Sequence, residues 1–375
     1  MRLAGEELQP LVTLATFAIG IAGGLVAKWI GAPLPMLLGS VVSVGTFAIL
    51  GLRAYGGPPK IPMWLRLVFL PIIGVSIGGA FTPAILADLA SWWPTLLAVF
   101  VYVPVVHWLG YQEYKRLGRL EPRTAYYAAV PGGLIEVIAM GEEAGADPAM
   151  LAMLQFLRLI LTILLVPLAF SLLEGGPVGS SSGAVLSKLD RPDAFDAAFL
   201  FVLGAAGFFG GRWIGMPAYV ITGPILMSGV AHLLGLIQTV PPSWLIEVTQ
   251  LVVGVSLGTR FVGMELSLVW RALHLAFINI LGTMVFAVVL ALVLHGAVGQ
   301  PTEAVTLAFA PGGLAEMALV AVSLEMSVVY VTAHHVVRII LSVSIAKMFA
   351  RRVAGADATG RRTGSAGSAP PPGRQ

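Results

Sequence analysis

A set of short motifs occurs twice in this chain, in the same order and at nearly constant spacing. Pro131-Gly132-Gly133-Leu134-Ile135-Glu136 matches Pro311-Gly312-Gly313-Leu314-Ala315-Glu316, which lies 180 residues later. The segment 74–78 matches 254–258 at the same distance, and the Trp-Ile-Gly-x-Pro segment 29–33 matches 213–217 at a distance of 184. An ordered repetition of this kind indicates a duplicated fold.

The duplication predicts four parts of the chain. Residues 1–173 form the first membrane repeat, 174–194 a loop between the repeats, 195–350 the second membrane repeat, and 351–375 a basic tail. The tail is rich in Gly, Ala, Ser, Pro and Arg, so we expect it to be disordered. Its arginines account for the net charge of +3, and we therefore expect no nucleic acid as a partner.

Both repeats are too apolar for a soluble enzyme. Hydrophobic residues make up 57% of the 375 positions and charged residues 11%, whereas a soluble domain carries roughly 25% charged residues. The chain has no cysteine, and no spacing of His, Asp and Glu resembles a metal site. The sequence predicts an all-α polytopic protein of the bacterial inner membrane, with the lipid bilayer around it and with no enzymatic activity, metal or cofactor.

Apolar runs of suitable length predict ten membrane spans. They cover residues 11–28, 33–51, 63–86, 92–111, 148–173, 195–212, 217–237, 244–259, 268–297 and 327–349. Two further segments, 124–142 and 304–323, are each interrupted by Pro-Gly-Gly. Each repeat thus has five spans and one broken segment.

The distribution of basic loops favours an inverted arrangement of the two repeats. If both broken segments are re-entrant, the basic loop 115–123 and the arginines at 212, 260 and 271 all lie in the cytoplasm, in agreement with the positive-inside rule. The alternative has twelve spans and parallel repeats, and it places those three arginines outside. Both arrangements put the N- and C-termini in the cytoplasm.

The broken segments are the first candidates for a binding site. Pro131, Gly132 and Gly133, and likewise Pro311, Gly312 and Gly313, interrupt the helical hydrogen bonds within the membrane. Such backbone is tolerated only where protein or a water-filled cavity satisfies it, and paired broken helices mark the site in many transporters. The alternative is that the motif only kinks two helices for packing.

A carboxylate and an arginine follow each break at matching positions. Glu136 and Glu316 lie about one helical turn past the second glycine, and Arg158 and Arg338 lie 22 residues further on. A carboxylate in a membrane segment is costly and is a candidate for proton exchange or cation binding. The arginines are expected either to gate the glutamates or to bind an anionic substrate. The alternative is a fixed structural ion pair within each repeat.

Polar residues also precede each arginine by three positions. Gln155 in the first repeat corresponds to His335 in the second. His335 is a candidate proton relay, and a hydrogen-bonded packing histidine is the equally weighted alternative.

The duplicated Pro-Gly-Gly-Leu-x-Glu with its downstream arginine, together with Trp-Ile-Gly-x-Pro, resembles the AbrB family of bacterial membrane proteins over roughly residues 10 to 350. This family is distinct from the soluble DNA-binding domain of the same name. The resemblance implies labels such as ammonia monooxygenase and regulator of gene expression, but no established set of functional residues.

These observations lead to three functional hypotheses. The first is a secondary transporter of a small solute, coupled to protons or another cation, with its site between the two breaks. The second is a membrane sensor that affects gene expression indirectly. An integral-membrane oxidase is third and disfavoured, because the sequence offers no ligand set for a redox metal. A homo-oligomer is compatible with all three.

Overall fold

The computed structural model describes residues 2–3, 6–7, 9–174, 192–324 and 326–365. Apart from a short antiparallel pair of strands, β1 (Arg2–Leu3) and β2 (Glu6–Glu7), the regular structure in these residues is helical. The predicted loop 174–194 falls largely outside the described residues.

The helices of the first half are α1 (Pro10–Trp29), α2 (Pro35–Ile49), α3 (Met63–Gly78), α4 (Pro83–Leu89), α5 (Trp93–Arg116), α6 (Pro122–Ala128), α7 (Leu134–Glu143) and α8 (Pro148–Glu174). Those of the second half are α10 (Ala194–Trp213), α11 (Tyr219–Leu233), α12 (Ser243–Gly258), the short 3₁₀ helix η1 (Thr259–Phe261), α13 (Leu266–Val298), α14 (Thr302–Phe309), α15 (Leu314–Ser323) and α16 (Val328–Ser365). Helices α1, α2, α3 and α7 have the same lengths as α10, α11, α12 and α15.

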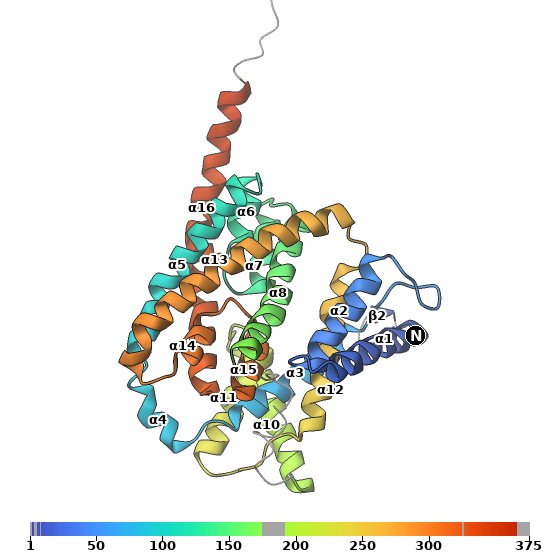
Figure 1. Cartoon of the computed structure of the whole chain (residues 1–375), viewed down its shortest axis with the longest axis vertical. Coiled ribbons are helices and arrows are strands. Elements are labelled where there is room, and N and C mark those ends of the chain that lie inside the picture. The colour runs from blue at the N-terminus through green and yellow to red at the C-terminus, as the bar shows by residue number, and fades with distance from the viewer. Residues whose placement is uncertain (1, 4–5, 8, 175–191, 325, 366–375) are drawn as a thin grey trace, which may run out of the picture.

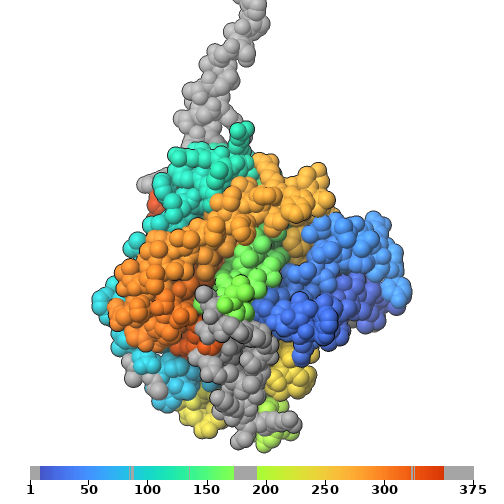
Figure 2. Space-filling model, in the orientation of Figure 1, coloured from blue at the N-terminus to red at the C-terminus, as the bar shows by residue number. Residues whose placement is uncertain are grey.

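Within the described residues, six helices are long and apolar enough to cross a membrane, namely α1, α5, α8, α10, α13 and α16. Helix α13 runs across one face of the molecule (Figure 2), and Leu281, Leu292 and Val293 on it are more than half exposed. A soluble protein rarely exposes apolar patches of this extent. The structure thus agrees with the predicted class of helical membrane protein.

The expected span 63–86 is not one continuous helix. Helix α3 ends at Gly78, and α4 begins at Pro83 after a short turn. Gly79 follows Gly78 directly, and two successive glycines together with a proline weaken a helix at this place. Helix α16 continues to Ser365, past residue 351 at which the predicted tail begins. Residues 366–375 lie outside the described residues.

The helices form two bundles, and each bundle takes equivalent helices from both halves (Figure 1). In the first bundle α2 packs on α1 and α12, while α11 packs on α10 and α3. The second bundle contains α5 to α8 and α13 to α16, and α16 extends out of it (Figure 1). Contacts of α3 with α15 and of α2 with α8 connect the two bundles.

Glycines allow the closest helix crossings in the first bundle. A Cβ atom on Gly39 would overlap the backbone of Gly23, and one on Gly223 would overlap the backbone of Gly207. The repeated 74–78 and 254–258 segments serve the same purpose, since Gly74 faces the Ile221 carbonyl of α11. Small residues at these crossings let the helix backbones approach each other directly.

Helices α5 and α13 occupy equivalent places in the two halves and run antiparallel along each other. The ring of Tyr102 stacks on Phe286 at a centroid distance of 5.6 Å. One level further along, Asn279 Nδ2 donates to Glu113 Oε2 at 3.1 Å. Beyond the end of α5, Arg271 Nη2 donates to the Gly118 carbonyl at 2.7 Å. As residue numbers rise along α5, the numbers of the residues that they contact on α13 fall, so the two helices are antiparallel.

Candidate functional site

Both Pro-Gly-Gly segments break a helix, as the sequence predicts. Between α6 and α7 the chain is non-helical from Ala129 to Gly133, and between α14 and α15 from Ala310 to Gly313. Gly133 precedes α7 with φ of 70° and ψ of 51°, a left-handed conformation that favours glycine. Pro131 and Pro311 donate no backbone hydrogen bond, so each break leaves carbonyl groups that need partners from elsewhere.

In the first half, Arg158 and Gln155 of α8 satisfy the carbonyls at the end of α6. Arg158 Nη1 donates to the Val130 carbonyl, and its Nη2 donates to Gln155 Oε1 at 2.7 Å. The amide of Gln155 donates to the Tyr127 carbonyl at 2.8 Å. A positive charge at the C-terminal end of a helix also interacts favourably with the helix dipole.

The second half repeats this arrangement with a different side chain. Arg338 of α16 donates to the carbonyls of Ala310 and Gly312, the latter at 2.6 Å. His335 Nε2 lies 3.0 Å from the Leu307 carbonyl, and its Nδ1 lies 3.3 Å from Arg338 Nη2. A carbonyl can only accept and a guanidinium can only donate, so these contacts assign the proton to Nε2. His335 thus takes the place of Gln155.

The two breaks lie against the last helix of the opposite half. Thr162 Oγ of α8 donates to the Pro311 carbonyl at 3.1 Å. Gly132 faces Ser342 of α16, where an added Cβ atom would lie 3.3 Å from the serine oxygen. Thr162 and Ser342 are 180 residues apart and four residues past the two arginines. Sequence comparison of the repeats could have identified this polar pair.

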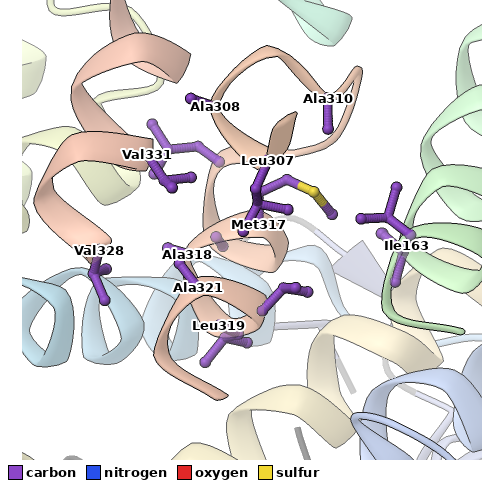
Figure 3. Close-up of a cluster of buried hydrophobic side chains, with 14 of the residues drawn as sticks. Ile163, Leu307, Ala308, Ala310, Met317, Ala318, Leu319, Ala321, Val328 and Val331 are labelled. Carbon is purple, nitrogen blue, oxygen red and sulfur yellow. The ribbon is translucent and has the colours of Figure 1, made fainter. Parts of the chain in front are cut away.

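The surroundings of the second break are apolar and tightly packed. Figure 3 shows Met317 of α15 pointing toward Ile163 of α8, beside the end of α14 and the start of α16. Tyr102 of α5 is buried nearby, and its hydroxyl has no hydrogen-bond partner in the part of the chain that is described.

The two glutamates follow the breaks in equivalent positions but in different environments. Glu136 and Glu316 both lie in the first turn of their helices, where the helix dipole favours a negative charge. Glu316 is 6% exposed, whereas Glu136 is exposed. Within the described residues, neither carboxylate has a basic nitrogen within 4.0 Å. The alternative of a fixed ion pair with Arg158 or Arg338 therefore differs from the structure, in which carbonyl groups take up both guanidinium groups.

The structure thus brings the predicted residues together as two capped breaks with one carboxylate each. The described residues contain no group of three or more His, Asp and Glu side chains suited to a metal ion. His334, next to His335, has a separate partner, because its Nε2 lies 2.9 Å from Thr95 Oγ of α5.

Comparison with known proteins places the chain in a family. The family described as "Transition state regulatory protein AbrB" matches residues 45–354. The "Uncharacterized protein YhjN" of Bacillus subtilis (strain 168) is 23% identical over 350 residues, which cover 89% of this chain and 91% of that protein. The "Putative regulator AbrB" of Escherichia coli (strain K12) is 24% identical over 313 residues, which cover 82% of this chain and 86% of that protein. With a match that includes both breaks and both arginines, the chain belongs to the AbrB family.

Proposed function

We propose that the protein is a secondary transporter of a small solute, built from two inverted repeats of five spans and one re-entrant broken segment each. Its substrate and a coupling proton or cation meet between the two breaks. The protein lies in the inner membrane with both termini in the cytoplasm. The observation that carries this proposal is the pair of broken helices, each capped by a buried arginine and followed by a carboxylate.

The antiparallel contact of α5 with α13 supports inversion. These helices are equivalent in the two repeats, and a two-fold axis that relates antiparallel neighbours runs perpendicular to them. For helices that cross a bilayer, such an axis lies in the membrane plane. Repeats related in this way are inverted, which is the arrangement that gives many transporters their two alternating states.

Two polar contacts support the ten-span arrangement over the twelve-span arrangement. Arg271 bonds to the Gly118 carbonyl within the basic loop 115–123, so both lie on one side of the membrane. Lys28 forms an ion pair with Glu247 at 3.5 Å, so the C-terminal end of α1 and the start of α12 would share one side of the membrane. Ten spans with two re-entrant segments satisfy both contacts, whereas twelve spans separate each pair across the membrane.

The division into two bundles offers the moving parts that transport requires. Equivalent helices of both repeats contribute to each bundle, and the contacts of α3 with α15 and of α2 with α8 lie between them. Alternating access in inverted-repeat transporters is largely a rocking of one such bundle against the other. In any one such state the two repeats have different surroundings. The burial of Glu316 and the exposure of Glu136 fit a difference of this kind.

The test is proton-coupled flux in proteoliposomes that contain a pH-sensitive dye. A panel of phosphate, small carboxylates, amino acids, sugars and ammonium is added across an imposed pH gradient. We expect one class to drive proton movement, and we expect Glu136→Gln and Glu316→Gln to abolish it. Glu142→Gln is the control, since Glu142 is exposed and its counterpart is Val322. Wild-type flux in both glutamine variants removes the glutamates from the mechanism.

A membrane sensor is the second candidate, favoured by the word regulator in the name of the Escherichia coli relative. A sensor binds its solute without moving it. A solute that raises the unfolding temperature of the purified protein but produces no flux in proteoliposomes decides for the sensor.

A further inference from the structure

Two arginines near the junction of the bundles, Arg66 and Arg260, belong to neither of the two breaks. Arg66 lies in the first turn of α3, and Arg260 lies in η1 directly after α12. Both are half-buried, and Arg260 lies against Met63, one helical turn before Arg66 on α3, so their positive charges act on each other. Holding two like charges together in a partly desolvated place is unfavourable unless an anion compensates them.

The protein itself supplies little compensation for these charges. Neither arginine has a carboxylate within 4.0 Å in the described part of the chain, and Arg66 Nε is buried there without a hydrogen-bond partner. Arg260 contacts weak partners, since its guanidinium lies 5.1 Å from the centre of the Phe156 ring and 4.0 Å from Met63 Sδ. A thioether is a weak acceptor, and both contacts leave most of its donors available.

A cavity of about 280 Å³ opens beside this pair. Its lining includes Lys60, Met63, Ser256, Thr259 and Arg260, which combine two cationic groups with two hydroxyl side chains. Arg66 follows Met63 by three residues on α3, so the two lie on one face of the helix. The cavity is thus lined by the exposed Lys60, by Arg260 and by Met63, one helical turn before Arg66.

The charge of Arg66 is also linked to the second break. Glu316 is the carboxylate whose negative charge acts on Arg66. Phe156 and Glu316 belong to the second bundle, whereas Arg66 and Arg260 belong to the first. The basic pair consequently lies where residues of both bundles meet, at the start of α3 and the end of α12, which the inverted arrangement puts on the cytoplasmic side.

We propose that Arg66 and Arg260 bind the anionic group of the transported solute, a carboxylate or a phosphate, which enters through the cavity beside Lys60. The planar forks of two arginines match the oxygens of such groups. The solute is thus an anion rather than a neutral or cationic compound. This step rests on the proposed transport function, but the site itself is defined by binding and does not require flux.

The test measures binding of phosphate, acetate and succinate to purified protein in nanodiscs of phosphatidylcholine, which has no net charge. We expect at least one of these anions to bind, and glycerol not to bind. Arg66→Gln and Arg260→Gln should each lower the affinity for the anion at least tenfold, because each removes a charged partner. Arg66→Lys should give an intermediate affinity and serves as the variant that keeps the charge if glutamine prevents folding. Arg212→Gln, an exposed arginine on α10, is the control and should bind like the wild type.

Three outcomes would overturn the proposal. The first is anion binding that Arg66→Gln and Arg260→Gln leave unchanged. The second is an equal loss in Arg212→Gln. The third is an absence of binding to free anions together with saturable stabilisation by phosphatidylglycerol, which would assign the pair to a lipid headgroup. Anion binding without flux supports this site and contradicts the transport function. Flux that does not depend on Arg66 or Arg260 supports the transport function and contradicts this site.

Discussion

The guanidinium groups of Arg158 and Arg338 illustrate how one residue makes broken backbone possible inside a membrane. Each proline and glycine break exposes carbonyl groups that lipid cannot satisfy. One arginine from a neighbouring helix supplies several donors in a fixed plane and a positive charge at the end of the half-helix. The residue that makes the candidate site possible therefore need not touch a solute.

Replacing either arginine should destabilise the fold more than it alters the chemistry of the site. In Arg158→Gln or Arg338→Gln, buried carbonyls lose charged partners, each worth about 1.5–3 kcal/mol. We expect a clear fall in the unfolding temperature of the detergent-solubilised protein. Glu316→Gln removes no partner of these carbonyls and is the control. If Glu316→Gln lowers the unfolding temperature as strongly as the arginine variants, the capping role is wrong.

The equivalence of His335 and Gln155 gives a substitution that separates structure from proton transfer. A glutamine amide can donate to the Leu307 carbonyl and accept from Arg338, as Gln155 does in the first half. We expect His335→Gln to keep the stability and the flux of the wild type, while His335→Leu loses stability by about 1–3 kcal/mol. A His335→Gln protein that is stable but has lost proton-coupled flux would establish the histidine as a relay.

At the scale of helices, the sequence predicts where the elements lie but not which of them meet. The repeat and the Pro-Gly-Gly motifs locate both breaks and the Gln155/His335 correspondence, because these depend on neighbouring residues. The 22-residue spacing of Glu136 and Arg158 suggests an ion pair, yet the guanidinium of Arg158 on α8 donates to the Val130 carbonyl just after α6. The proximity of Arg66 to Arg260 depends on tertiary packing between separate helices, which no local pattern encodes.

The glycine crossings allow a test of helix packing with a matched control on the same helix pair. Alanine at Gly223 would place its Cβ against the Gly207 carbonyl, where only a backbone shift can make room. Overpacking of this kind costs about 1–3 kcal/mol, so Gly223→Ala should lower the unfolding temperature. Gly210 on α10 has nothing within 4 Å of the added atom, and Gly210→Ala should be neutral or stabilising by up to about 1 kcal/mol. Equal effects of the two substitutions would contradict the close crossing.

For the whole molecule, the duplicated sequence yields two mixed bundles rather than two separate domains. Helix α2 packs on α12, and α3 packs on α11. In the repeat, α2 corresponds to α11 and α3 corresponds to α12. Neither half can therefore bury its own apolar surface alone. The same exchange brings α3, η1, α8 and α15 together, so that one site takes residues from both repeats and both bundles. Motion of the bundles would change the environment of Arg66, Arg260 and Glu316 at once.

The orientation of the repeats in the membrane is testable because the chain has no native cysteine. Lys28→Cys should react with a membrane-impermeant maleimide added outside intact cells, and Arg119→Cys should not, in either arrangement of the repeats. Arg212→Cys and Arg271→Cys decide between the arrangements. Inverted repeats keep both inside, so labelling should require permeabilised cells, in agreement with the bond from Arg271 to the Gly118 carbonyl. Labelling of both positions from outside would establish twelve spans, and with it parallel repeats in place of the inverted ones on which the proposed transport cycle depends.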